Sequence, residues 1–367
     1  MTQRFNPSRL VVARQRRQLS KKVLADRLGV TPKMVLYYEA GDKAPSDQVV
    51  EKMIDVLGFP ARFFFATDVE APTVENASFR SFSRMSSSQR DGALAAGGLA
   101  YAVSDWLEDH FTLPAVAVPD LSGMEPEAAA MMLRSKWSLG VLPIKNLVHI
   151  LESRGVRVFS LVEDSRNVNA FSVWRDGERP FIFLNTVKSS ESSRFDAAHE
   201  LGHLVLHRHG ATKGKEAESE ADNFASAFLM PRTEMLAYAY ACRSVADVMR
   251  IKKRWNVSAM ALTYRLHRVG VLTDWLYRSM CIELSKLRMR TCEKDSAPRE
   301  TSLVLKKVLD SMKPAGSGLR AIAESLALPV QEVHKLVAGL TPAALGAVNS
   351  AAQLSAPRRG HLSVVSG

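Results

Sequence analysis

The sequence predicts a multidomain protein in which an all-α N-terminal domain precedes an α+β domain with a small mixed sheet and then a helical C-terminal region. The length of 367 residues exceeds that of one ordinary domain and allows two or three. The first part of the chain alternates short helical patterns with glycine stops. Near residue 156 the hydrophobic period changes from helical to strand-like.

Charge and cysteine content narrow the classes of function. The net charge of +11 indicates a polyanionic partner, for which nucleic acid is the first candidate. The 3 cysteines are odd in number and scattered, so neither a disulfide framework nor a cysteine zinc site is indicated. No apolar run approaches the roughly 20 residues of a membrane span, and the stretch "MTQRFNPSRLVVARQRRQLS" contains no apolar h-region of the kind found in signal peptides. We therefore expect a cytoplasmic protein without a membrane partner.

Two short helices near the N-terminus have clear start and stop signals. Ser20 is suited to cap "KKVLADRLG", which Gly29 ends. Thr31 can cap the next helix, with Pro32 at the first helical position, and "KMVLYYEAG" runs to Gly41. The pattern predicts helix, tight glycine turn, helix.

Three positions in this pair of helices match the needs of a helix-turn-helix. The first helix needs a small residue where the second crosses it, the turn needs tolerance of positive φ, and a β-branched residue lies under the second helix. Ala25, Gly29 and Val35 occupy these places. The periodicity also places three apolar residues on one face of the first helix: Val23, Leu24 and Leu28.

This stretch resembles the XRE/Cro-type helix-turn-helix family over about residues 8–65, including "YYEAGDKAPS" after the second helix. Arg14 and Glu39 stand where that family pairs two charges beneath the fold. Lys21 stands where the family usually has glutamine, so its phosphate contact would be ionic. Residues 1–43 hold ten Lys or Arg against three Asp or Glu, as phosphate binding requires.

The resemblance implies double-stranded operator DNA as the partner. An earlier helix is expected to begin in "SRLVVARQRRQ", which makes "KMVLYYEAG" the third helix of the domain. In such modules the start of the third helix enters the major groove, so Lys33, Tyr37 and Thr31 would face bases, whereas Ser20 and Lys21 would face phosphates. Such modules usually bind two DNA half-sites that lie one helical turn apart, so we expect the protein to bind as a homodimer. A small helical protein-binding module is the alternative, and salt-insensitive or absent DNA affinity would distinguish it.

The middle of the chain changes first in composition and then in its hydrophobic pattern. A stretch rich in Ser, Thr, Pro and Asn over about residues 66–87 predicts a flexible linker. Helices are expected over about residues 91–110 and 126–137 and in "IKNLVHILESRG". Three strand-like runs follow, namely "VRVFSL", "AFSVWR" and "PFIFLNT". A small mixed sheet is therefore predicted beside the next helix.

That helix carries "RFDAAHELGHLVLH", residues 194–207. His199 and His203 are four residues apart, so on a helix their imidazoles project from one face and can hold one ion. Glu200 follows the first histidine and would lie beside an open coordination position, where a general base is needed. Gly202, inside the helix, indicates close approach of another backbone. A half-buried helix with exposed polar residues is the alternative, because a five-residue match arises by chance.

A third ligand is needed to complete a metal site. His209 has the spacing of the last histidine in a metzincin, but Leu206 occupies the glycine position, so we expect the helix to run on through His207 and exclude His209.

The segment "EAESEADNFASAFLMP" offers a glutamate on a second, antiparallel helix instead. Glu216, Glu218 and Glu220 all qualify by residue type, and we choose Glu218. Asp222 lies one turn later, where it can accept a hydrogen bond from a ligand histidine.

The two segments together resemble the ImmA/IrrE family of metallo-endopeptidases, over roughly residues 125–275. The resemblance implies a zincin-like fold with Zn²⁺ held by His199, His203 and Glu218 and with Glu200 as the base. Asp222 replaces the asparagine that is commoner in that family.

Two further features follow from this resemblance. "FIFLN" resembles the edge strand on which such peptidases extend a substrate by β-augmentation. Tyr264 is a candidate to polarise the scissile carbonyl, and packing in the core is the equally weighted alternative.

A fusion of these two families is a familiar layout, and "LTDWLYRSMCIELSKLRMR" resembles the extension seen in such regulators up to about residue 287. Two short amphipathic helices follow in "GLRAIAESLALPVQEVHKLVAGL", for which an interaction or dimer module is favoured over a second helix-turn-helix. Residues 91–110 or these helices would join the dimer. We expect five segments: 1–70 for DNA binding, 71–124 as linker and helix, 125–275 as the peptidase domain, 276–350 as a helical region, and 351–367 as a disordered tail.

The sequence thus predicts a sequence-specific transcription regulator with a zinc-dependent endopeptidase domain that cleaves a partner repressor or antitoxin. The alternative is a DNA-binding regulator whose metal domain is a non-catalytic sensor or scaffold. In both cases the DNA-binding and metal domains are expected to act independently across the linker.

Overall fold

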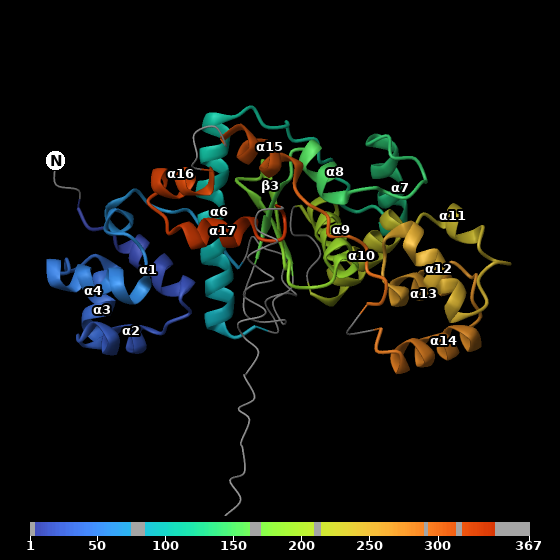
Figure 1. Cartoon of the computed structure of the whole chain (residues 1–367), viewed down its shortest axis with the longest axis horizontal. Helices are drawn as coiled ribbons and strands as arrows, with labels where there is room; N and C mark the ends of the chain where they lie inside the picture. The colour runs from blue at the N-terminus through green and yellow to red at the C-terminus, as the bar shows by residue number, and fades with distance from the viewer. Residues whose placement is uncertain are drawn as a thin grey trace, which may run out of the picture.

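A computed structural model of the chain describes residues 4–74, 85–161, 170–208, 214–289, 293–312 and 318–341. An N-terminal group of helices, a central part with the sheet and a third group of helices follow one another along the long axis (Figure 1). This arrangement confirms the predicted fold class. None of the described helices is both long and apolar enough to cross a membrane.

The N-terminal domain forms as its capping residues predict. Ser20 Oγ accepts a hydrogen bond from the backbone N–H of Val23, and Thr31 Oγ1 accepts one from that of Met34. Gly29 and Gly41 end their helices with φ of +72° and +79°, a region that favours glycine. The elements are α1 (Pro7–Arg16), α2 (Lys21–Leu28), α3 (Pro32–Ala40), α4 (Asp47–Leu57) and the 3-10 helix η1 (Ala61–Phe65).

Packing of the N-terminal helices corrects one prediction. Leu24, Leu28 and Val35 are fully buried, whereas Val23 is 40% exposed. Val23 precedes Leu24 by one residue, which turns its side chain about 100° around the helix axis and away from the core. The prediction that Val23 shares the buried face was therefore wrong.

The central part contains a three-stranded sheet with order β1-β3-β2. Strand β3 is parallel to β1 and antiparallel to β2, so it is bonded on both sides. The expectation that "FIFLN" forms a substrate-binding edge strand was therefore wrong, because this run is the central strand. The elements of this part are α6 (Ser87–His110), α7 (Pro126–Lys136), α8 (Leu147–Ser153), β1 (Arg157–Ser160), β2 (Phe171–Arg175), β3 (Arg179–Leu184), α9 (Ser190–Leu206) and α10 (Lys215–Leu229).

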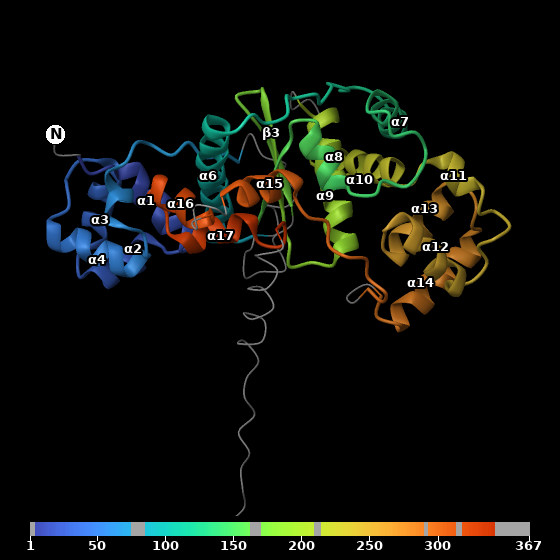
Figure 2. The ribbon, with the colours of Figure 1, turned by 45° about the horizontal axis from the view of Figure 1, so that its top comes forward.

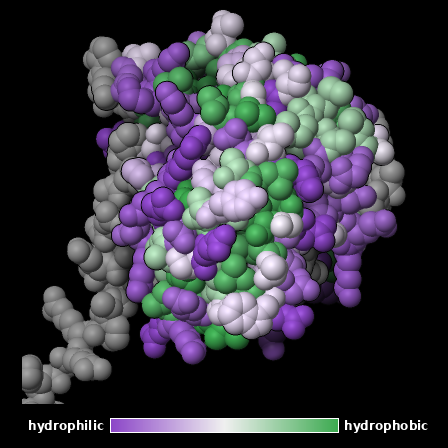
Figure 3. Space-filling model, turned by 90° about the vertical axis from the view of Figure 1, so that its right-hand side faces the viewer, coloured by the Kyte–Doolittle hydropathy of each residue, from purple (hydrophilic) through white to green (hydrophobic). Residues whose placement is uncertain are grey.

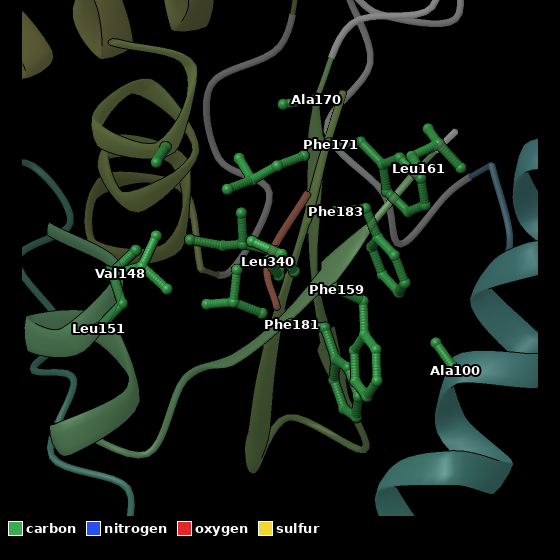
Figure 4. Packing of buried hydrophobic residues seen from close by; sticks show 14 of the residues in the cluster. Ala100, Val148, Leu151, Phe159, Leu161, Ala170, Phe171, Phe181, Phe183 and Leu340 are labelled. Atoms are coloured by element: carbon green, nitrogen blue, oxygen red, sulfur yellow. The ribbon is translucent and has the colours of Figure 1, made fainter. Parts of the chain in front are cut away.

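The two faces of the sheet pack against different helices. Phe159, Phe181 and Phe183 point toward α6, and Val148 of α8 lies on the opposite side (Figure 4). The ring of Tyr101, on α6, lies 4.6 Å from that of Phe181. The alternate residues of β2 face α9, where Trp174 Nε1 donates a hydrogen bond to the Leu204 carbonyl oxygen and Ser172 approaches Glu200. The sheet thereby supports the helix that carries the His-Glu-x-x-His motif.

A helical group follows α10 and lies at one end of the molecule (Figure 1). It comprises α11 (Arg232–Leu236), α12 (Val245–Trp255), α13 (Ala259–Arg268) and α14 (Asp274–Lys286). Hydrophobic residues appear among hydrophilic ones on this side of the protein (Figure 3). The exposed apolar side chains of this group include Leu236, Trp275 and Ile282.

The C-terminal helices return to the N-terminal domain (Figure 2). They are α15 (Leu303–Met312), α16 (Gly318–Ser325) and α17 (Val330–Val337). Glu332 of α17 accepts hydrogen bonds from Arg16 Nε at 2.8 Å and Arg17 Nη1 at 2.6 Å, and its side chain is 2% exposed. Arg16 Nη1 also donates to the Gly92 carbonyl oxygen of α6. The N-terminal domain thus packs against α6 and contacts α17, in addition to its connection through the predicted linker.

The same packing bears on the expected dimer surface. Most of α6 is buried under its own chain, including Leu99, Tyr101 and Leu107. Helix α17 packs against α6, and α1 packs there as well. Residues 91–110 therefore leave little surface for a second copy. The predicted disordered tail, residues 351–367, lies outside the described residues.

Candidate metal centre and nucleic-acid interface

Helices α9 and α10 bring two histidines and one glutamate together. The Nε2 atoms of His199 and His203 are 3.1 Å apart. Glu218 places one carboxylate oxygen 3.3 Å from His199 Nε2 and the other 3.5 Å from His203 Nε2. Glu218 is the one of the three glutamates considered from the sequence that approaches both histidines.

These separations fit a tetrahedral metal ion. Zinc bonds of about 2.0–2.1 Å to nitrogen and oxygen imply a distance of about 3.3 Å between neighbouring ligand atoms. The distance between the two histidine nitrogens, and the distance from each of them to its nearer Glu218 oxygen, lie within a few tenths of an ångström of this value. With one ligand atom taken from each residue, the three atoms lie within 4.8 Å of one another. Two imidazoles and a carboxylate are also donors that suit a divalent transition metal.

The electrostatics of the group favour positive charge at its centre. Burial lowers the pKa of His199, but hydrogen bonds with Asp222 and Glu218 outweigh it and raise the pKa to about 10. Burial opposes ionisation of Glu218, yet its hydrogen bonds with the two histidines lower its pKa to about 2. The group therefore stabilises a cation among its donors, as a metal site must.

Asp222 occupies the predicted supporting position. Its Oδ1 atom lies 2.8 Å from His199 Nδ1, which leaves Nε2 of that imidazole directed toward Glu218. A carboxylate behind a ligand histidine sets the orientation and tautomer of the ring. Asp222 thus contacts the side of His199 that a metal would not use.

Glu200 is buried between α9 and strand β2 of the sheet. Its side chain is 3% exposed, and its Oε2 accepts a hydrogen bond of 2.7 Å from Ser172 Oγ on β2. Its negative charge also contributes to the raised pKa of His199. The carboxylate is therefore close to the histidines and held by the strand, as a positioned base requires.

Gly202 allows α10 to approach α9. A Cβ atom at this position would lie 3.1 Å from Phe224 Cδ1 and 3.2 Å from Ala221 Cα. The close approach of a second backbone, expected from the sequence, is confirmed. This close approach of α10 brings Glu218 within reach of His199 and His203 on α9.

Two other sequence candidates have different positions. Tyr264 on α13 is 42% exposed, so it is not a core residue. Among the described residues, no hydrogen bond or ion pair joins Tyr264 to the metal group. His209 lies outside the described residues, and α9 runs to Leu206 with His207 as its C-terminal cap, close to the predicted end.

The predicted base-reading residues lie on the exposed face of α3. Lys33 Nζ is 5.6 Å from the centre of the Tyr37 ring, and Lys43 Nζ is 5.3 Å from it. Leu36 is 48% exposed on the same helix. Together with Thr31 at the helix start, these residues form a basic face with aromatic and aliphatic surface, which we call the α3 face.

The predicted phosphate contacts lie at the start of α2. Ser20 caps this helix, and Lys21 Nζ lies 3.3 Å from Glu39 Oε2. Glu39 is also paired with Arg14, as the sequence predicts. Lys21 remains 44% exposed at its side chain, so its ammonium group can still meet a phosphate at the surface.

Comparison with known families matches both parts of the chain. The helix-turn-helix family model matches residues 12–64, and the model of the IrrE N-terminal-like domain matches residues 151–267. The chain is a fusion of an XRE-type helix-turn-helix domain and an IrrE-like peptidase-family domain. No curated protein matches the chain.

The IrrE-like domain belongs to a peptidase family that is generally metal-dependent, and it carries the His199, His203 and Glu218 group. The helix-turn-helix domain indicates double-stranded DNA as a partner. The first assignment agrees with the geometry of the metal group, and the second agrees with the basic, exposed α3 face.

Sequence reasoning missed several residues of both sites. Ser172 gave no signal, because it meets Glu200 only through the packing of β2 against α9. Leu36 lies on the same helix as Lys33 and Tyr37 and could have been found from its exposed helical position. Lys43 follows the end of α3 at Ala40, so helical spacing does not place it beside Tyr37. His207 lies one turn beyond His203, and the sequence predicted for it only that the helix runs on through this residue.

Proposed function

We propose that this protein is a sequence-specific DNA-binding transcription regulator whose IrrE-like domain is a zinc-dependent endopeptidase acting on a partner repressor or antitoxin in the cytoplasm. The observation that carries the peptidase half is the convergence of the His199 and His203 Nε2 atoms with Glu218. The α3 face supports the DNA-binding half.

The residues of the metal group have separate roles in this proposal. His199, His203 and Glu218 hold the ion, and zinc is favoured because this ligand set is typical of zinc peptidases. When bound, zinc polarises the scissile carbonyl and lowers the pKa of water toward neutrality. Asp222 orients His199 from behind.

Glu200 accepts the proton of the attacking water and passes it to the leaving amine. Its burial and its hydrogen bond from Ser172 hold the carboxylate in one orientation. Tyr264 is proposed to donate a hydrogen bond to the substrate carbonyl oxygen. Its 42% exposure is consistent with contact to a substrate that arrives from solvent.

The α3 face reads the operator in the same proposal. Lys33, Tyr37 and Thr31 face base edges, and Leu36 offers an apolar surface to the thymine methyl group. Ser20, Lys21 and Lys43 contact phosphates. Two copies bind two half-sites of a palindromic operator, because modules of this type read half-sites one helical turn apart.

Three variants test the peptidase half. His199→Ala and Glu218→Ala should each lose most bound zinc, whereas Glu200→Gln should keep the ion and lose hydrolysis, because the base is not a ligand. Zinc content is measured by elemental analysis, and cleavage is assayed against the repressors encoded beside the gene. Full zinc occupancy in Glu218→Ala would contradict the ligand set.

Regulation in the cell separates the enzyme from a sensor or scaffold. If the peptidase is the working part, Glu200→Gln abolishes regulation although the protein still occupies the operator. Regulation that survives Glu200→Gln and is lost with Lys33→Ala would overturn the peptidase role and leave the metal domain as a sensor or scaffold.

A further inference from the structure

We propose that His207 and Glu220 form a hydrogen-bonded arm that holds His203 in the tautomer and orientation needed for metal binding. This inference rests on the proposed metal centre and assigns two positioning residues to it. Neither residue is a metal ligand in this proposal. They act only through His203.

The arm is a continuous chain of short contacts behind His203. The Nδ1 atoms of His203 and His207 are 2.9 Å apart. On the other side of the second ring, His207 Nε2 lies 2.7 Å from Glu220 Oε2. The side chains of His203 and His207 are 9% and 7% exposed, so water competes little for these contacts.

The donors and acceptors in this chain can be assigned in only one way when the imidazoles are neutral. An ionised carboxylate only accepts, so His207 must donate from Nε2 to Glu220. A neutral imidazole has one donor and one acceptor, which makes His207 Nδ1 the acceptor. His203 must then donate from Nδ1, and the lone pair of its Nε2 is directed toward His199 and Glu218.

The two ligand histidines are therefore supported in parallel ways. Asp222 contacts Nδ1 of His199 directly, whereas Glu220 reaches Nδ1 of His203 through an intervening imidazole. Both carboxylates belong to α10, the helix that also supplies Glu218. One helix thus provides a ligand and the orientation of the other two, as hydrogen-bonded carboxylates do behind metal-bound histidines.

The test measures zinc affinity of the full chain by competition with a chromophoric chelator and records the absorption spectrum of the Co²⁺-loaded protein. His207→Ala and Glu220→Ala should each weaken zinc binding by about 10–100-fold, the usual effect of removing such a partner. The Co²⁺ spectrum should change in both variants, because His203 loses its fixed orientation.

Two further variants distinguish positioning from a general structural effect. Glu220→Gln keeps an oxygen that accepts from His207, so its zinc affinity should return most of the way to that of the unaltered protein. The double variant H207A/E220A should bind zinc no more weakly than the worse single variant, because both changes break one arm. Glu216→Ala is the matched control, since Glu216 is exposed on the same helix.

The outcomes separate this inference from the metal centre itself. If His199→Ala empties the site but His207→Ala keeps zinc affinity and the Co²⁺ spectrum unchanged, the arm is overturned and the centre stands. If Glu220→Gln empties the site, Glu220 is itself a ligand and the arm is overturned. If His199→Ala leaves zinc bound, the proposed centre fails first.

Discussion

Gly202 lies where α9 meets α10, and a Cβ atom added there would require its neighbours on α10 to shift by a few tenths of an ångström. Phe224 is fully buried, and the other neighbour is the Ala221 backbone. Alanine favours a helix over glycine by about 1 kcal/mol, but overpacking a core costs about 1–3 kcal/mol. Gly202→Ala should therefore lower the free energy of unfolding by about 1 kcal/mol, measured by urea denaturation.

Ser219→Ala is the matched control for this prediction. Ser219 is exposed on α10, where alanine has a slight helical advantage, so the variant should be neutral or slightly more stable. Stabilisation by Gly202→Ala of the same size would show that α10 can shift away from α9 without loss.

Leu36 is a position where a single side chain is expected to affect the affinity for DNA. Its exposed aliphatic surface on the α3 face should contact a thymine methyl group of the operator. Replacing that thymine by deoxyuridine should cost the unaltered protein about 1 kcal/mol of binding free energy, the value of one buried methyl group. Leu36→Ala should show almost no loss on the same change.

The measurement uses an operator selected from random duplexes by the full chain, with thymines replaced one at a time. Lys33→Ala is the comparison variant, because it alters a polar contact and should retain sensitivity to the methyl group. An equal loss in the unaltered protein and in Leu36→Ala would contradict the role of Leu36.

At the level of elements, the contact of α17 with α1 depends on one buried carboxylate. Burial raises the pKa of Glu332, but Arg16, Lys335 and Arg17 outweigh it and hold the pKa below its ordinary value of 4.5. As pH falls below 4.5, the unfolded chain takes up a proton before the folded chain does. The stabilisation by Glu332 is therefore complete above that pH and is lost as the pH falls through the lowered pKa.

Glu332→Gln should remove this pH-dependent component and lower the free energy of unfolding at neutral pH by about 3 kcal/mol, because it leaves buried Arg16 without its partner. Denaturation at pH 7 and pH 3.5 measures both effects. Glu324→Gln on α16 is the control, since its pair with Arg320 is exposed and worth little. Identical acid profiles for both variants would contradict the assignment.

For the molecule as a whole, the net charge of +11 and the basic N-terminal domain should make DNA binding depend steeply on salt. The logarithm of the affinity should fall with that of the salt concentration with a slope of several units, since several phosphates are neutralised. Lys21→Ala should reduce the slope by about 1 and weaken all sequences alike.

Glu200→Gln should leave both the slope and the operator affinity unchanged, because Glu200 contacts the sheet and the metal group rather than the N-terminal domain. Fluorescence anisotropy at a series of salt concentrations measures both quantities. A changed operator affinity in Glu200→Gln would show that the contact through α6 and α17 couples the two domains.

The sequence by itself determined what depends on neighbours along the chain. Ser20, Thr31 and the glycine stops predicted helix ends correctly, because caps and positive φ are local properties. The strand runs were also located correctly. The spacing of His199 and His203 predicted two imidazoles on one helical face, and the structure places their Nε2 atoms together.

The tertiary structure decided everything that joins distant segments. Residue type alone allowed Glu216, Glu218 or Glu220 to be the third metal ligand. The close approach of α10 to α9 at Gly202 places Glu218 beside both histidines. Strand order made "FIFLN" central, because β3 pairs with both β1 and β2. The pairing of Arg16 with Glu332 spans most of the chain. Such contacts depend on how elements pack in space, which local patterns do not specify.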